Sequence, residues 1–226
     1  MLSYMNKLIT LLSLFLLFVT NSAFTACTDN VNKETEDAEF TTNWKERNAQ
    51  YFDSLLNVAR QKVTEARTQY GDDWEQHCEW RVFLSYAKST GGPSTDSICA
   101  RVISTSSSTD ARIPLYTDSV KINYMGHLMP TQSYKEGRVF DHSGIYENND
   151  YVFSPTYSVP ARFAVSNLVE GLTTAIMHMH INDRWMVYIP QELGYGKLTR
   201  GVMPGYSTLC FDLQLKDICR KGDSFQ

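Results

Sequence analysis

The sequence predicts an α+β protein, in which a long N-terminal helix precedes a strand-rich half that holds one short helix. Three observations support this class. Apolar residues recur with helical spacing over Asn43–Tyr70, β-prone residues dominate three later stretches, and between those stretches only Val169–Met179 has a helical pattern. The three stretches are Ser119–Tyr124, Arg184–Ile189 and Thr208–Leu215.

The composition is that of an ordinary globular protein. The 226 residues suit one medium-sized domain with appendages, and 42% of them are hydrophobic and 20% charged. The formal net charge of -4 provides no broad basic surface, so no nucleic acid partner is expected.

Residues 1–26 have the pattern of a signal peptide. Lys7 provides a positive start, and Leu8–Thr20 is an uncharged apolar run of 13 residues. Such a run is too short to cross a hydrocarbon core of roughly 30 Å, but it has the length of a signal-peptide core. We therefore expect residues 1–26 to be absent from the mature protein.

Phe24-Thr25-Ala26-Cys27 places small residues directly before a cysteine and resembles the lipobox of bacterial lipoproteins, although Phe24 replaces the usual leucine. The resemblance implies that Cys27 is lipidated and becomes the new N-terminus; ordinary signal cleavage is the alternative. The polar, acidic residues 27–42 would form a flexible tether. The expected location is the cell envelope, lipid-anchored outside the cytoplasm on the periplasmic face or the outer-membrane surface.

The predicted long helix has one apolar face, which is expected to pack on the main domain or on a second copy of the chain. Asn43, with Glu46 three residues later, has the pattern of an N-terminal cap, and Gly71 can end the helix. A homodimer through this helix, acting as a clamp-like chaperone, remains open. The apolar positions are Trp44, Tyr51, Phe52, Leu55, Val58, Ala59, Val63, Ala66 and Tyr70.

A turn signal at Ser89–Ser94 marks the expected end of the helical N-terminal extension, residues 43–95. Residues 74–88 contain several aromatic side chains, which would dock the extension to the rest. The main domain is expected to span residues 96–222.

Ordered motifs in the second half carry a family resemblance. They are VKINYMG at 120–126, GRVFDHS at 137–143, FAVSNLVEGL at 163–172 followed by Met179, WMVYIPQELGYG at 185–196, and MPGYSTLCFDL at 203–213. Their order is similar to that of FKBP-type peptidyl-prolyl cis/trans isomerases, and the resemblance covers roughly residues 96–219. The whole chain resembles the lipoprotein form found in Gram-negative bacteria.

The resemblance implies an antiparallel sheet of five to six strands wrapped around one short helix, with an apolar pocket for proline between them. It also assigns the site positions. The implied catalytic residues are Tyr124, Phe140, Asp141, Val169, Tyr195 and Phe211, and the implied substrate-binding residues are Leu168, Leu172, Val202 and Met203.

The implied reaction is rotation about X–Pro bonds of exported polypeptides. Its barrier of about 18–20 kcal/mol is amide resonance, so the enzyme needs only to bind the twisted amide better than the planar one. By the resemblance, Phe140 and Phe211 would hold the proline ring, while the N–H of Val169 and the hydroxyl of Tyr195 would bind substrate carbonyls. Asp141 would orient the site through a hydrogen bond to a neighbouring side chain.

Two departures from the family favour a different class of function. Leu172 stands where the family has a tryptophan, and Ala161 stands at a second aromatic position. Both reduce the apolar surface around proline. The alternative is therefore a non-catalytic peptide-binding or chaperone module with a degenerate proline pocket.

No cofactor and no metal are expected. His178-x-His180 lacks a supporting pattern of cysteines or carboxylates, and no CxxC spacing occurs. Besides Cys27 there are four cysteines, for which three pairings or free thiols remain open. They are Cys78, Cys99, Cys210 and Cys219.

Overall fold

The structure, a computed structural model, describes residues 38–88, 93–106, 111–147, 150–152, 154 and 157–225. The expected signal peptide and the lipidation site at Cys27 lie outside the described residues. Glu39–Gln226 form one compact unit. Within the described ranges, no helix is both long enough and apolar enough to cross a membrane.

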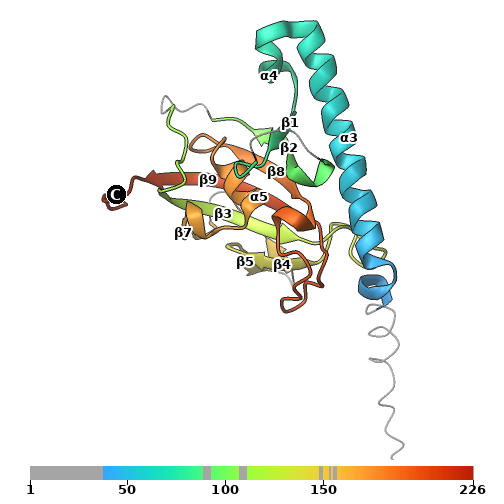
Figure 1. Ribbon diagram of the computed structural model, residues 1–226. Helices are drawn as coiled ribbons and strands as arrows, with labels where there is room; N and C mark the ends of the chain where they lie inside the picture. The colour runs from blue at the N-terminus through green and yellow to red at the C-terminus, as the bar shows by residue number, and fades with distance from the viewer. Residues whose placement is uncertain are drawn as a thin grey trace, which may run out of the picture. The chain divides into compact units, whose positions relative to one another are not determined.

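A seven-stranded antiparallel sheet forms the centre of this unit (Figure 1). The strand order is β1-β2-β8-β9-β3-β4, and β7 also pairs with β3. The strands are β1 (Trp80–Leu84), β2 (Ser97–Ser104), β3 (Ser119–His127), β4 (Val139–His142), β7 (Ala161–Ala164), β8 (Arg184–Ile189) and β9 (Leu209–Cys219). β5 (Ile145–Glu147) and β6 (Asp150–Val152) form a separate two-stranded hairpin.

The α+β class is confirmed, but the sheet has more strands than the five to six expected. β1 comes from the segment 43–95, which was expected to be a helical extension. It pairs with β2 from Trp80↔Arg101 to Leu84↔Ser97. Four of its five residues are apolar, so the sequence shows no strand alternation there. The half-buried Trp80 and Val82 pack on one face of the sheet and the half-buried Phe83 packs on the other, which explains that composition.

The predicted long helix is confirmed as α3 (Trp44–Tyr70). Gly71 ends it with a φ of 57°, a conformation that favours glycine, and the Gly71 N–H donates to the carbonyl of Arg67. Asn43 is the N-cap residue at the expected position, but it has a φ of 48° and its side chain makes no capping hydrogen bond. The short helix α4 (Trp74–His77) follows the turn η1 (Gly71–Asp73).

Two hydrophobic clusters lie on opposite faces of the sheet, because alternate strand residues point to opposite sides. The larger one holds Ile98 and Ala100 of β2 together with the buried face of α5 (Glu170–Ile176). The smaller one holds Cys99 of the same strand with Phe52 and Leu56 of α3. The sheet therefore carries α5 on one face, and Phe52 and Leu56 of α3 pack on the other.

α3 is held to its own sheet by polar contacts as well as by apolar packing. The Trp44 Nε1 donates to the Ser207 hydroxyl at 3.0 Å. The buried Asn48 accepts from the Thr208 N–H at 2.8 Å through its side chain, and from the Thr208 hydroxyl at 3.0 Å through its carbonyl. The expected packing on the main domain is therefore present. A homodimer through this helix stays a prediction.

The folded unit begins earlier than expected. Phe40 is only 6% exposed and packs edge-on against Trp44, with ring centroids 5.3 Å apart. The carboxylate of Glu39 accepts hydrogen bonds from the Ser133 N–H at 3.1 and 3.2 Å. The tether expected over residues 27–42 therefore ends by residue 39.

The four cysteines outside the expected lipidation site are free thiols. Cys99 of β2 and Cys210 of β9 flank Tyr188 of β8, because each of them pairs with Tyr188 across the sheet. Two strand spacings amount to about 9–10 Å, which is beyond the Cα separation that a disulfide spans.

Candidate active site

Tyr124 occupies the centre of the candidate site, on the α5-facing side of β3. Its hydroxyl is hydrogen-bonded to the carboxylate of Asp141 on β4. Burial, and then the negative charge of Asp141, raise the pKa of Tyr124. The phenol therefore stays protonated at neutral pH and can donate to the carboxylate.

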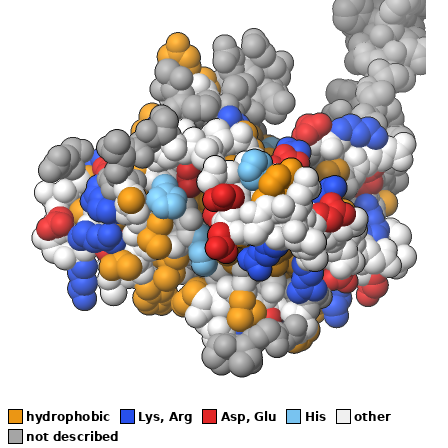
Figure 2. Space-filling view, turned by 90° about the horizontal axis from the view of Figure 1, so that it is seen from above, with side chains coloured by type: hydrophobic (Ala, Val, Ile, Leu, Met, Phe, Trp, Pro, Cys, Tyr) orange, Lys and Arg blue, Asp and Glu red, His pale blue; other side chains and the backbone are white. Residues whose placement is uncertain are grey.

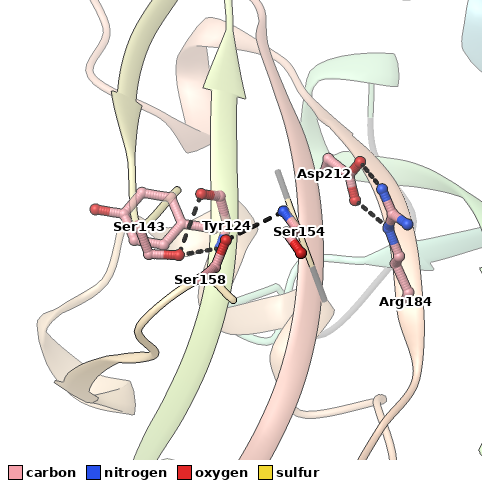
Figure 3. Close-up of polar contacts among 6 residues, drawn as sticks. All are labelled: Tyr124, Ser143, Ser154, Ser158, Arg184 and Asp212. Carbon is pink, nitrogen blue, oxygen red and sulfur yellow. Dashed lines mark hydrogen bonds and ion pairs between the residues drawn. The ribbon is translucent and has the colours of Figure 1, made fainter. Parts of the chain in front are cut away.

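The backbone around this pair is fixed by Ser143 (Figure 3). The Tyr124 N–H donates to the Ser143 hydroxyl at 2.8 Å, and the Ser143 N–H donates to the Tyr124 carbonyl at 2.9 Å. The Asp141 carboxylate also accepts the His142 N–H at 2.9 Å. Backbone and side-chain hydrogen bonds thus join the Phe-Asp-x-Ser motif to the Tyr-x-Gly motif of β3. The Asp141 carboxylate accepts hydrogen bonds from the Tyr124 hydroxyl and the His142 N–H.

Phe140 and Phe211 form an aromatic corner beside Tyr124. Their rings meet edge to face, with centroids 5.5 Å apart. Phe211 is buried and lies 6.3 Å from the Tyr124 ring, whereas Phe140 is only partly buried. Gly126 makes the corner possible, because a Cβ there would lie 2.6 Å from Phe140 and 2.9 Å from Phe211.

The start of α5 forms another part of the site. Val169 is the N-cap residue of this helix, so its N–H has no partner within the helix. Its carbonyl accepts the Thr173 N–H at 2.9 Å. Leu168 is partly buried, and Leu172 is buried in the core at 5% exposure. This arrangement leaves a backbone donor at the edge of an apolar surface.

The loop between β8 and β9 supplies Tyr195 and Met203. Tyr195 is partly buried in the same cluster, and it lies close enough to Tyr124 to contribute to raising the pKa of that phenol. The Arg200 guanidinium lies 4.5 Å from the centre of the Tyr195 ring. Sequence reasoning missed Arg200, which lies outside the recognised motifs. Met203 is buried at 2% exposure.

Eight of the ten expected residues belong to the same hydrophobic cluster: Tyr124, Phe140, Leu168, Val169, Leu172, Tyr195, Met203 and Phe211. Asp141 joins them through its hydrogen bond to Tyr124.

Val202 lies apart from this group. It is 42% exposed and lines a groove on the α3 side of the sheet, together with Tyr51 and Tyr188. Phe163 is a neighbour outside the ten, with its ring 5.8 Å from that of Tyr124. In the sequence, Phe163 begins the FAVSNLVEGL motif, and the resemblance assigned it no site role.

Comparison with known proteins gives a family match that covers these residues. Residues 111–216 match the family model described as FKBP-type peptidyl-prolyl cis-trans isomerase. The chain is 34% identical over 134 residues to the FKBP-type 22 kDa peptidyl-prolyl cis-trans isomerase of Escherichia coli, which covers 58% of this chain and 55% of that protein.

Two further similarities extend the comparison. The macrophage infectivity potentiator of Trypanosoma cruzi is 32% identical over 108 residues, covering 47% of this chain and 46% of that protein. The chain thus spans about half the length of the curated relatives it matches first. The crystal structure of FkpA from Escherichia coli aligns with a TM-score of 0.44 at 19% identity, covering 95% of this chain and 82% of that one.

Proposed function

We propose that the protein catalyses cis/trans isomerisation of X–Pro bonds in polypeptides, on the premise that residues 111–216, which match the FKBP-type peptidyl-prolyl cis-trans isomerase model, belong to that family. The observation that carries the proposal is the aromatic corner of Phe140 and Phe211, which stands beside a hydrogen-bonded Tyr124–Asp141 pair. It joins an apolar surface for a proline ring with polar groups at its edge.

The proposed mechanism is preferential binding of the twisted amide. A twisted amide has lost its resonance and is less polar than the planar form, so an apolar surface stabilises it relative to the ground state. The Val169 N–H and the Tyr195 hydroxyl would bind the carbonyls that flank the proline. Asp141 acts by positioning Tyr124, because its carboxylate accepts a hydrogen bond from the Tyr124 hydroxyl, which keeps its proton.

The test is the isomerisation rate of a short X–Pro peptide with the wild-type protein, Phe140→Ala and Tyr195→Ala. We expect acceleration by the wild type and a loss of about 10-fold to 100-fold in each variant. Tyr70→Ala, on the exposed side of α3, is the matched aromatic control and should retain full activity. No acceleration by folded wild-type protein would refute the catalytic proposal.

A non-catalytic peptide-binding module is the second candidate, and the small side chains at Leu172 and Ala161 support it. The same variants distinguish the two functions. A binding module would bind the X–Pro peptide and lose affinity in Phe140→Ala, without accelerating isomerisation in any form of the protein.

The proposed clients are exported polypeptides, and the proposed location is the cell envelope, with Cys27 lipidated after cleavage. The support for this location is the apolar run Leu8–Thr20 followed by Phe24-Thr25-Ala26-Cys27. Metabolic labelling with a radioactive fatty acid should mark the wild type and leave Cys27→Ala unlabelled. Equal labelling of both would refute lipidation at this residue.

A further inference from the structure

A cavity of about 390 Å³ lies beyond the end of α5 that is remote from Val169. His178, which follows the last turn of α5, forms part of its wall, together with Phe83 of β1 and Trp185 of β8. The volume lies within the range of about 300–1,000 Å³ that is typical of small-ligand sites. None of the ten expected site residues lines this cavity.

The cavity has an exposed mouth and a buried polar floor. Glu75 and Thr105 stand exposed at the mouth. Arg81, Asp183 and Trp185 lie at the floor, exposed by only 6%, 4% and 4%. Figure 2, which views the molecule from above, shows histidine and acidic side chains close to hydrophobic ones on the upper face.

The floor offers hydrogen-bond donors that lack acceptors in the part of the chain described. The indole N–H of Trp185 is buried and has no partner there. Arg81 uses three of its five N–H groups on the carbonyls of Glu75, Cys78 and Trp80, at 2.6 to 2.9 Å. Two donors of Arg81 therefore remain, beside an indole that needs an acceptor.

The same cavity offers acceptors. The Asp183 carboxylate takes the Ser106 N–H at 2.7 Å and the His180 N–H at 2.9 Å, one at each oxygen, which leaves further lone pairs. The Nδ1 of His178 lies 2.8 Å from the Thr174 carbonyl, so in the neutral ring Nδ1 carries the proton and Nε2 is an acceptor. A ligand that both donates and accepts would match this set.

Charge and shape narrow the ligand class. With neutral histidines, Arg81, Asp183 and Glu75 give the wall a net charge of -1, which disfavours binding of an anion. The hydrogen-bond donors of Arg81 and Trp185 at the floor disfavour binding of a cation. The ring of Phe83 stacks on those of His178 and Trp185, with centroids 4.0 and 5.8 Å apart, so nearly parallel aromatic rings form part of the wall. An uncharged planar group with one acceptor and one donor fits, and a peptide amide is such a group.

We propose that this cavity binds a peptide amide of a polypeptide client, as a second peptide subsite separate from the proline site. The amide oxygen accepts from Trp185 and Arg81, and the amide N–H donates to Asp183 or to Nε2 of His178. The presence of polypeptide clients rests on the proposed isomerase function. The chemistry of the cavity does not depend on it.

The test uses the indole N–H of Trp185 as a reporter in a nitrogen–proton correlation spectrum of the isotopically labelled protein, assigned by its disappearance in Trp185→Phe. The probe is N-acetyl-trialanine amide, which is uncharged and contains no proline. We expect its addition to shift the Trp185 signal saturably. The indole signal of Trp44, which is already bonded to the Ser207 hydroxyl, is the internal control and should not move.

Two results with the wild type would overturn the proposal. Absence of a Trp185 shift at saturating peptide would mean that only water occupies the cavity. An equal shift with sodium acetate, at matched concentration and ionic strength, would mean a carboxylate site.

Val102→Phe fills the cavity from its β2 wall, where Val102 is half-buried and pairs with Trp185. We expect about 10-fold weaker peptide affinity in this variant, with the X–Pro isomerisation rate unchanged. Unchanged affinity would place the binding elsewhere and refute the subsite. A wild-type protein that shifts Trp185 but isomerises nothing would refute the proposed function alone.

Discussion

The rings of Phe140 and Phe211 meet edge to face, with centroids 5.5 Å apart, and both lie within 3 Å of the point that a Cβ of residue 126 would occupy, which Gly126 leaves open. The glycine belongs to the same strand as Tyr124, and the phenylalanines come from β4 and β9 on either side of it. Three strands thus converge on one aromatic corner. The absence of a side chain at Gly126 is the condition for it.

Gly126→Ala should therefore separate activity from folding. The new Cβ would lie 2.6 Å from Phe140, so the aromatic corner must move by a large part of an ångström. We expect the isomerisation kcat/KM to fall by about 100-fold. A second substitution, Phe140→Leu, should relieve the closer of the two clashes and restore part of the thermal stability without restoring activity. Wild-type activity in Gly126→Ala would show that the corner is not part of the site.

Asn48→Ala should destabilise the protein through α3. The substitution leaves the buried Thr208 N–H without its acceptor, which costs about 1–3 kcal/mol of unfolding free energy. Urea denaturation measures this change. Asn57→Ala, at an exposed position of the same helix, is the matched control and should stay within about 0.5 kcal/mol of the wild type. Equal effects at the two positions would refute the role of the Asn48–Thr208 contact.

Stability should decline at alkaline pH because of a buried cluster beneath α3. Burial raises the pKa of Tyr188 to about 12 and that of Cys210 to about 12, and it also raises the pKa of Cys99. The unfolded chain loses these protons at lower pH than the folded chain does. The unfolding free energy should therefore be constant below about pH 8 and fall above it, by up to about 1.4 kcal/mol per pH unit for each group.

Urea denaturation between pH 7 and pH 11 measures this dependence. Cys210→Ala should flatten the decline, whereas Cys78→Ala, outside the cluster, should leave it unchanged. A decline of the same slope in Cys210→Ala would assign the effect to other groups.

Gly171→Ala tests the close approach of α5 to the sheet. A Cβ at this position would lie 2.3 Å from Cγ2 of Ile189, so the helix or the strand must shift. We expect a loss of about 1–3 kcal/mol in unfolding free energy, despite the better helix propensity of alanine. The double variant with Ile189→Ala should be no less stable than Ile189→Ala alone. Additive losses would contradict a direct clash.

Local sequence patterns were sufficient to predict the elements in which buried residues recur at a regular spacing along the chain. The apolar spacing over 43–70 and the glycine that follows predicted α3 to the residue at its C-terminal end, Tyr70. Most of the candidate site also followed from the sequence, because its residues lie in short motifs, such as GRVFDHS, whose order carries the family resemblance.

Tertiary structure decided what depends on partners distant in the chain. β1 is a strand because it pairs with β2, with Trp80 and Val82 packed on one face of the sheet and Phe83 on the other; its apolar composition alone would also suit a helix. Val202 and Met203 are adjacent in sequence, yet only Met203 is buried in the core beside Tyr195. The contact between Asn48 and Thr208 joins residues 160 positions apart. The spacing of apolar residues predicts which face of a helix or strand is buried. Which other segment covers that face depends on packing between residues that are distant in the sequence.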